Sequence, residues 1–546
     1  MTDSSLFYIF SFPVFASTSP GASFPYPEPR IVELLILVSF IFLLNVSRSI
    51  ADYFLHGGII AEIALGMVYG RPLAAILPAS WEETFTVLGY LGLIGIVFAG
   101  GLSTELPLLL ANLPLSTLCA LTGIGLPVAF SFALLTAGYG YEPLEAFAAG
   151  AALSSTSLGT TLMALNSVAS GVQDSGAAGI AKREAAKLEA EPRQYSPPLH
   201  KSRIGTILIS AAVIDDVIGL VLASLVPALS LQHGASEPKT NLAWTIIRPI
   251  LSSVLMAVIT PILARFILRP IYWYRNFGPR WCLPREPDKP WGCPRLLRMV
   301  SRRQVDSASE DQWGTQCHAD VIAISSMILG ISAFSAIAFY SGSSVLFGAY
   351  LAGLTVAYIS KPQPTGTLSP AAQHTVISDP HTFEATYERT VGPLQRTLLA
   401  PLFFASIGYA IPFLSLWQPR ILWRGILYAI LMGIAKLCVG VPILLCGTLT
   451  KPPQVPSSSL TTRARNSTYP ALFMGVAMIA RGEIGLLIAQ LARTQSSSSS
   501  DRGLLGDEVF LVCIWAILLC TLLSPISLGI IVRRLGHKIT QGIWGR

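Results

Sequence analysis

Apolar runs long enough to cross a membrane follow one another along most of this 546-residue chain. A transmembrane helix needs about 20 mostly apolar residues, and only helices or closed barrels satisfy their backbone polar groups inside a bilayer. Charged residues make up 12% of the chain, against about 25% in soluble proteins. The sequence therefore predicts an all-α polytopic membrane protein. About thirteen transmembrane helices are expected, at residues 31–50, 56–77, 83–101, 113–136, 144–168, 203–227, 243–269, 318–340, 343–359, 397–415, 421–448, 469–492 and 506–532.

The loop charges predict an orientation for these helices. With the N-terminus outside and the C-terminus in the cytosol, the cytosolic loops 169–202 and 270–317 are rich in Lys and Arg, while the outer loops carry few basic residues. This distribution obeys the positive-inside rule. Residues 1–30 then form an extracytosolic tail, because they lack the basic start of a signal peptide, and residues 534–546 form a cytosolic tail. The plasma membrane and an internal membrane stay equally open.

The remaining composition narrows the classes of function. The net charge of +7 is explained by cytosolic loops of a membrane protein, so the lipid bilayer is the expected partner and nucleic acid is not. The eight cysteines show no CxxC spacing and most lie in apolar runs, where they act as small hydrophobic residues. We expect no cofactor.

The runs divide into two halves around a connector. Repeat one covers 31–227, the connector helix 243–269, and repeat two 318–533, all within one transmembrane domain. The fifth run of each half is interrupted by small, polar or charged residues, at 148–166 and 475–493. Unwound backbone at membrane depth is tolerated only where it lines a polar cavity. Paired interrupted helices therefore indicate a transporter binding site between the two halves.

Two adjacent aspartates, Asp215 and Asp216, lie near the middle of the run 203–227. One charged aspartate at that depth costs at least roughly 2.5–3.5 kcal/mol, so the pair needs a counter-charge, a bound cation or a proton. Consecutive residues on a helix project about 100° apart, so one can face the bundle and the other a cavity. The pair indicates ion handling, but the spacing does not say which aspartate does what. Adjacent aspartates do not fit an intramembrane protease, whose two carboxylates lie on separate helices, and we expect no enzymatic activity.

Lys436 is the candidate counter-charge, because it lies near the centre of the run 421–448 and is too deep to reach either interface. Pairing with one aspartate would offset part of both desolvation costs. A purely structural salt bridge stays open and is compatible with transport. In the interrupted run, Ser155, Thr156 and Ser157 offer hydroxyl and backbone oxygens, the hard donors that suit a small cation.

Arg481 and Glu483 are opposite charges two residues apart in the second interrupted run. Such residues do not face each other on a regular helix, although they can across a break. We expect both to support the broken helix rather than to contact the substrate directly.

Segments that carry these residues, taken in order, resemble the monovalent cation:proton antiporter-2 family of the sodium/proton exchanger superfamily. The long loops suggest a eukaryotic, fungal-like member. The resemblance covers nearly all of 31–533, and its most specific part is the combination of the aspartate pair with Arg-Gly-Glu. The matching segments are 61–72 (AEIALGMVYGRP), 91–106 (LGLIGIVFAGGLSTEL), 153–159 (LSSTSLG), 214–216 (IDD), 401–408 (PLFFASIG), 435–436 (AK) and 480–486 (ARGEIGL).

This resemblance implies an NhaA-like inverted-repeat fold with two crossed broken helices, a homodimer, and exchange of Na⁺ or K⁺ for H⁺. It implies that Asp216 binds the ion and the proton alternately and that Asp215 pairs with Lys436. Thr156 and Ser157 would complete the cation site. Two other functions remain as alternatives: a cation channel-like protein and an ion-sensing membrane protein that does not transport.

Overall fold

A computed structural model describes residues 30–55, 58–104, 106–156, 202–233, 242–274, 310–360, 383–449, 460–493 and 504–539, together with Glu28 and Trp544. All regular elements in these ranges are helices, which confirms the all-α prediction. Eight of the described helices are long and apolar enough to cross a membrane, and three shorter apolar helices accompany them. The total of thirteen spans stays a prediction. The predicted cytosolic loops 169–202 and 270–317 lie largely outside the described residues.

The helices follow the apolar runs along the chain. Those before the loop at 275–309 are α1 (Ile31–Leu55), α2 (Gly58–Tyr69), α3 (Ala79–Leu102), α4 (Leu106–Ala111), α5 (Leu113–Ser131) with the π-helical turn η2 (Phe132–Gly138), α6 (Pro143–Ser154), α8 (Arg203–His233), α9 (Leu242–Leu263), η4 (Ala264–Leu268) and α10 (Arg269–Tyr274). Those after it are α12 (Glu310–Ser341), α13 (Val345–Ser360), α15 (Phe383–Thr390), α16 (Gly392–Leu394), η6 (Gln395–Leu399), α17 (Ala400–Tyr409), α18 (Phe413–Leu416), α19 (Pro419–Leu437), α20 (Gly440–Leu449), α21 (Leu460–Ala477), α22 (Glu483–Arg493) and α23 (Asp507–Ile539).

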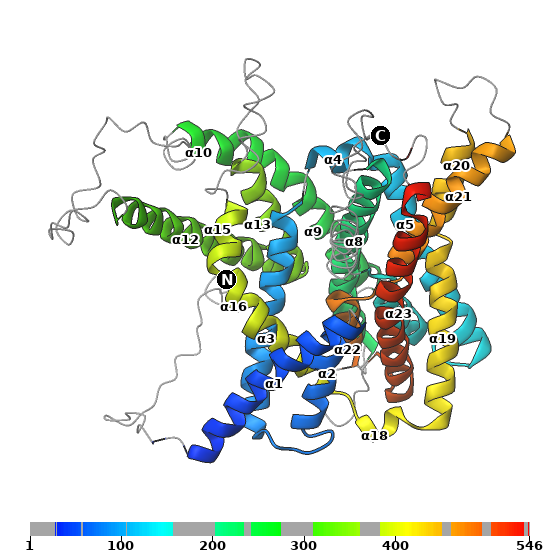
Figure 1. Cartoon of the computed structure of the whole chain (residues 1–546), viewed down its shortest axis with the longest axis horizontal. Helices are drawn as coiled ribbons and strands as arrows, with labels where there is room; N and C mark the ends of the chain where they lie inside the picture. The colour runs from blue at the N-terminus through cyan, green and yellow to red at the C-terminus, as the bar shows by residue number, and fades with distance from the viewer. Residues whose placement is uncertain are drawn as a thin grey trace, which may run out of the picture.

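The helices pack as two groups, and each group draws on both halves of the chain (Figure 1). In the first helix group, α3 packs against α13 and α17, α2 against α1 and α17, and α12 against α13. In the second helix group, α5 packs against α6 and α8, α22 against α6 and α8, and α23 against α19 and α21. The groups meet where α8 contacts α13, where α17 contacts α22 and where α1 contacts α23, and α9 packs between α8 and the helices α12 and α13.

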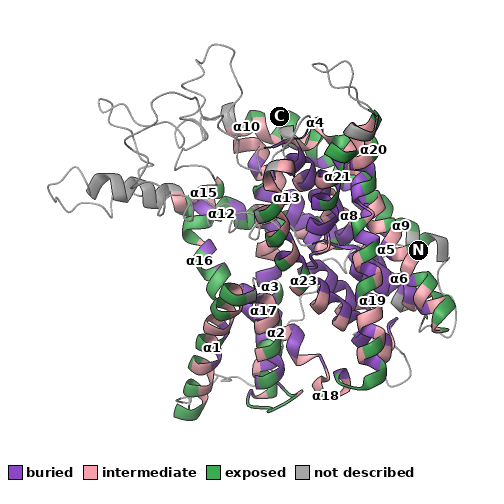
Figure 2. Ribbon diagram, turned by 45° about the vertical axis from the view of Figure 1, so that its right-hand side comes forward, coloured by how far each residue is buried: buried purple, intermediate pink, exposed green. Residues whose placement is uncertain are grey.

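Burial separates the central helices from those at the periphery (Figure 2). In the most apolar stretch of each helix, 61% of the residues of α8 and 67% of those of α23 are buried, against 11% for α1 and α12. The exposed side of α1 is lined by large apolar side chains, as expected of a surface that faces lipid. The helix that carries the aspartate pair is therefore among the innermost of the described helices.

Glycine allows the closest contacts within the first helix group. A methyl group added to Gly66 of α2 would lie 2.2 Å from the carbonyl oxygen of Ala405 in α17, and one added to Gly408 would lie 2.3 Å from that of Ile63. The two backbones thus touch from both sides, which is how small residues join helices in membranes. This contact fixes α17 against α2.

The ends of the helices alternate between two faces of the molecule, as a polytopic chain requires. In Figure 1, α4, α10, the end of α20, the start of α21 and the end of α23 lie at one end, whereas α18 and the α2–α3 connection lie at the other. This arrangement agrees with the alternation expected from the loop charges, while the side of the membrane that each end faces stays a prediction.

One predicted span differs from the structure in its continuity. The predicted span 421–448 corresponds to one candidate crossing, Pro419–Leu449, but a short break divides it, since α19 ends at Leu437 and α20 begins at Gly440. Pro442 explains the break, because its ring has no N–H to donate and collides with the carbonyl of the residue four positions earlier, Cys438. Lys436 consequently lies in the last turn of α19 rather than in mid-helix.

Candidate functional site

An unwound stretch separates α21 from α22. Residues 478–482 are not helical, and they include Arg481 and the glycine before Glu483. The interruption predicted for 475–493 therefore lies between these two helices. Glu483 is the first residue of α22, and its side chain lies outside the described part of the structure.

The first interrupted helix loses its helical conformation at the predicted serines. Helix α6 ends at Ser154, and Ser155 is extended, with ψ of 138°. Ser155 and Thr156 are both buried. Ser157 lies outside the described residues.

The two interruptions contact each other at a place that we call the crossing, where side chains bind the opposite backbone. Arg481 Nη1 donates to the carbonyl oxygens of Ser154, at 3.1 Å, and Ser155, at 3.0 Å. Thr156 Oγ1 donates to the carbonyl of Met478 at 3.5 Å. Thr521 on α23 donates to the carbonyl of Arg481 at 3.0 Å. Backbone groups that the helix breaks leave open are thus satisfied by the opposite break or by α23.

Arg481 has an electrostatic reason to occupy the crossing. Its side chain is fully buried, and the carbonyls that it binds form the C-terminal end of α6, which carries a partial negative charge. A guanidinium there offsets the charge of the helix end while completing its hydrogen bonds. This geometry fits the helix-supporting role predicted for Arg481.

Lys436 reaches the same crossing from α19. Its ammonium donates to Thr156 Oγ1 at 2.9 Å and to Asp215 Oδ2 at 3.2 Å. Both charged side chains of this ion pair have an exposed fraction of 0%. Gly123 of α5 makes room for the lysine, since an added methyl group would lie 3.2 Å from Nζ. The structure thus brings the predicted counter-charge together with one aspartate and one predicted oxygen donor.

The two aspartates occupy different environments. Asp215 is fully buried against Lys436, whereas Asp216 is only half-buried. The charge of Asp216 also acts on Lys436 and on the hydroxyl of Tyr350 in α13, a helix of the first group. The roughly 100° between neighbouring side chains on a helix separates the two carboxylates in this way.

Two buried oxygens at the crossing are open to a ligand. Asp215 Oδ1 and Ser155 Oγ have no hydrogen-bond partner among the described residues. Ser155 faces α8 one turn beyond Asp215, since a methyl group added to Gly219 would lie 3.4 Å from Ser155 Oγ. Carboxylate and hydroxyl oxygens are the ligands that small hard cations take. The crossing can therefore hold a proton or a monovalent cation beside the side chains of Lys436 and Arg481.

Sequence reasoning missed the residues that surround this crossing. Thr521 lies in an ordinary apolar run, and Tyr350 lies in a helix with no charged residue, so neither carried a local signal. Away from the crossing, Glu62 of α2 did carry a local signal, because it is the single acidic residue in the apolar run 56–77. Its partner could not be inferred from spacing.

Comparison with known proteins identifies a family. The family model described as "Sodium/hydrogen exchanger, transmembrane" matches residues 36–174 and 314–534, more than half of the chain. These segments contain both helix interruptions and Lys436, while Asp215 and Asp216 fall between the matched segments.

Two characterised antiporters are also similar to this chain in sequence. The high-affinity Na⁺/H⁺ antiporter NhaS3 of Synechocystis sp. is 27% identical over 172 residues, 31% of this chain and 31% of that protein. The Na⁺/H⁺-K⁺ antiporter GerN of Bacillus cereus is 21% identical over 476 residues, 86% of this chain and 88% of that protein. The match thus spans about a third of the length of one relative and most of the other. With the family model covering more than half of it, the chain belongs to the sodium/hydrogen exchanger family.

Proposed function

We propose that the protein is a secondary active antiporter that exchanges a monovalent cation, Na⁺ or K⁺, for H⁺ across a membrane. The observation that carries this proposal is the cluster of Asp215, Lys436 and Thr156 at the crossing of two unwound stretches. Family membership supports the proton-coupled exchange. The two relatives, a Na⁺/H⁺ antiporter and a Na⁺/H⁺-K⁺ antiporter, support Na⁺ and K⁺ as cations.

We assign the exchangeable site to Asp216. It is half-buried next to a fully buried ion pair, so it is the aspartate that an ion can reach. Asp215 stays paired with Lys436, and the oxygens of Ser155, Thr156 and Ser157 complete the cation site. Arg481 holds the crossing in place through the carbonyls of α6.

Exchange follows from competition for one carboxylate. A carboxylate can hold a proton or help to coordinate a cation, but not both at once. The second helix group is expected to move against the first only when this charge is neutralised. The carboxylate then opens to each side of the membrane in turn, and the cation and the proton replace each other on it. A difference of one pH unit supplies about 1.4 kcal/mol per proton. A potential of 100 mV adds about 2.3 kcal/mol per net charge moved.

The expected setting of the protein completes the proposal. The N-terminus lies outside and the C-terminus in the cytosol, and the chain works as a homodimer. Residues 31–227 and 318–533 form the two inverted repeats around the connector helix 243–269. Each helix group contains helices from both repeats, which supports this division.

The proposal is tested by transport in proteoliposomes under an imposed pH gradient, with Na⁺, K⁺ and Li⁺ compared. Wild type is expected to move protons when a cation is added, and Asp216→Asn is expected to reduce this movement to the background of empty liposomes. Asp507→Asn is the matched control, because Asp507 is an 81% exposed side chain at the start of α23 and should leave exchange unchanged.

Two results would contradict the proposal. Cation-driven proton movement that survives in Asp216→Asn would show that another group is the exchangeable site. Cation movement without any proton coupling in wild type would favour the channel-like alternative.

A further inference from the structure

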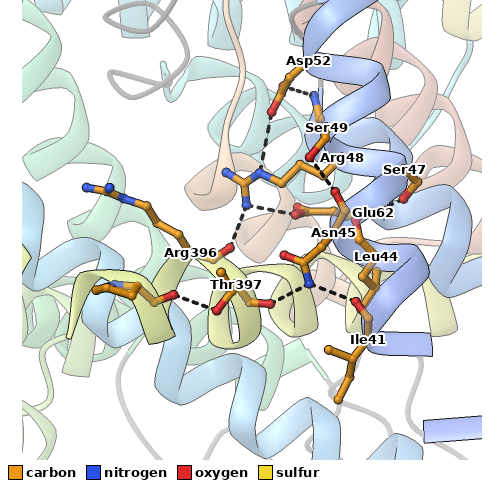
Figure 3. A network of polar contacts seen from close by, with 12 residues as sticks. Ile41, Leu44, Asn45, Ser47, Arg48, Ser49, Asp52, Glu62, Arg396 and Thr397 are labelled. Atoms are coloured by element: carbon orange, nitrogen blue, oxygen red, sulfur yellow. Dashed lines mark hydrogen bonds and ion pairs between the residues drawn. The ribbon is translucent and has the colours of Figure 1, made fainter. Parts of the chain in front are cut away.

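The first helix group contains a buried charged residue, Glu62, to which no role has been assigned so far. Glu62 of α2 has an exposed fraction of 0%, in a helix whose other residues are uncharged. A charged side chain at membrane depth is costly and needs a specific reason. Figure 3 shows the polar network that surrounds it, built from α1, α2 and η6.

Arg48 of α1 is the centre of this network. Its Nη1 donates to Glu62 Oε1 at 3.0 Å and to the carbonyl oxygen of Arg396 at 3.4 Å, and its Nε lies 3.7 Å from Asp52 Oδ2. Asp52 in turn accepts a hydrogen bond of 2.7 Å from the backbone N–H of Gly58. One guanidinium thus serves two carboxylates and a carbonyl.

Glu62 Oε2 is buried and has no hydrogen-bond partner among the described residues. Glu82 of α3 offers a contrast within the same helix group. Its Oε1 accepts the backbone N–H of Arg71 at 3.0 Å, and its Oε2 lies 3.0 Å from Arg71 Nε. A buried carboxylate oxygen without a donor keeps its full desolvation cost. A proton on Glu62 removes that cost. Protonation of Glu82 would bring no comparable gain, because both of its oxygens already have donors.

The network tolerates a neutral Glu62. If Glu62 takes a proton, Arg48 keeps Asp52 as its counter-charge and the carbonyl of Arg396 as an acceptor. Exposure rises from 0% at Glu62 to 23% at Arg48 and 46% at Asp52, so the second counter-charge of Arg48 is partly exposed. Both protonation states are therefore compatible with the same backbone.

The same side chains hold the segment that leads into α17. Arg48 donates to the carbonyl of Arg396, and Asn45 Nδ2 donates to that of Thr397 at 2.9 Å. Both acceptors belong to η6, a π-helical turn whose widened ladder changes the usual backbone pairing. Helix α17 follows directly and contacts α22 of the second helix group. Contacts thus connect Arg48, through η6 and α17, to the boundary between the two helix groups.

In the part of the chain that the structure describes, few other charges act on Glu62. The charged groups that interact with Glu62 are Arg48 and Asp52, both on α1. Arg396 of η6 directs its own side chain to Glu388. Helix α17, which packs against α2, contains no Asp, Glu, Lys or Arg.

We propose that Glu62 is a second proton-binding carboxyl, separate from the aspartate pair, whose occupancy changes the hold of Arg48 on η6 and thereby sets the pH dependence of exchange. The site takes a proton and no other ligand. The last step rests on the proposed function, whereas proton binding at Glu62 does not.

Proton binding is tested by infrared difference spectroscopy of the purified protein in lipid during a pH titration. The C=O stretch of protonated carboxyls is compared between wild type, Glu62→Gln and Glu82→Gln. One titrating band is expected to disappear in Glu62→Gln and to remain in Glu82→Gln. If Glu62→Gln does not fold, Glu62→Asp keeps the carboxyl, and its band is expected to titrate at a shifted pH. A set of bands that is the same in the Glu62 variant as in wild type would overturn the proposal.

The regulatory step is tested by exchange rates across a pH series. Glu62→Gln fixes the neutral state, so its acidic and alkaline rates are expected to approach each other, while Glu82→Gln keeps the wild-type profile. An unchanged profile in Glu62→Gln would overturn the regulatory step. If wild type itself shows no exchange, the proposed function fails while the infrared result still decides proton binding.

Discussion

Among the described residues, each helix group has an ion pair with a fully buried carboxylate, and the two pairs are built differently. In the second helix group, Lys436 and Asp215 are both fully buried. In the first, Glu62 is fully buried but Arg48 is 23% exposed and also approaches Asp52. Arg48 has Asp52 as an alternative counter-charge on its exposed side. For Lys436, the other nearby carboxylate is that of Asp216, which is half-buried. We therefore expect the Lys436–Asp215 pair to stay intact and the Arg48–Glu62 pair to tolerate the loss of one charge.

The largest expected effect comes from breaking the fully buried pair. Asp215→Asn leaves the ammonium of Lys436 buried without its bonded carboxylate, and Lys436→Gln leaves the carboxylate without its cation. Removing one partner of such a pair costs about 3–5 kcal/mol. The measurement is the fraction of detergent-solubilised protein that stays monodisperse after heating.

A double variant sharpens this result. Asp215→Asn combined with Lys436→Gln replaces both charges with neutral groups, so it is expected to recover most of the stability that either single variant loses. Losses that simply add would show that the two side chains do not act as a pair.

Breaking the other pair is expected to cost less. Arg48→Gln leaves Glu62 without its cation, but a proton can neutralise the carboxyl, and what remains is the loss of hydrogen bonds to buried acceptors. Such a loss costs about 1–3 kcal/mol. The same heating assay measures it. A loss as large as that of Asp215→Asn would remove the distinction between the two pairs.

The smallest effect is expected for the outer member of the network. Asp52 is 46% exposed and lies 3.7 Å from Arg48 Nε, and exposed ion pairs contribute about 0–1 kcal/mol. In Asp52→Asn, the amide oxygen can still accept the N–H of Gly58. Thermal stability should therefore stay close to that of wild type, and a large loss would show that Asp52 has a structural role beyond its charge.

Much of this architecture could be predicted from local sequence. The apolar runs placed the helices because a bilayer accepts only helices of that length and composition here. Small and polar residues marked both interruptions, and the depth of Asp215, Asp216 and Lys436 marked them as functional. These signals are local, since they depend on the cost of each residue at its depth and not on its neighbours in space.

The break after Lys436 shows where this reasoning stopped. Hydropathy alone predicted one helix over 421–448, although Pro442 lies within that run and ends α19 before it. The proline was a local signal in the sequence, but the prediction followed the length of the apolar run instead.

The sequence by itself determined that this chain is an all-α polytopic membrane protein with two interrupted helices and a deep pair of aspartates. Only the tertiary structure decided which side chains meet: Arg481 with the end of α6, Lys436 with Asp215 and Thr156, and Arg48 with Glu62 and η6. The physical reason is that desolvation acts on each residue where it stands, whereas the ion pairs and hydrogen bonds that offset it join residues from helices far apart in the chain.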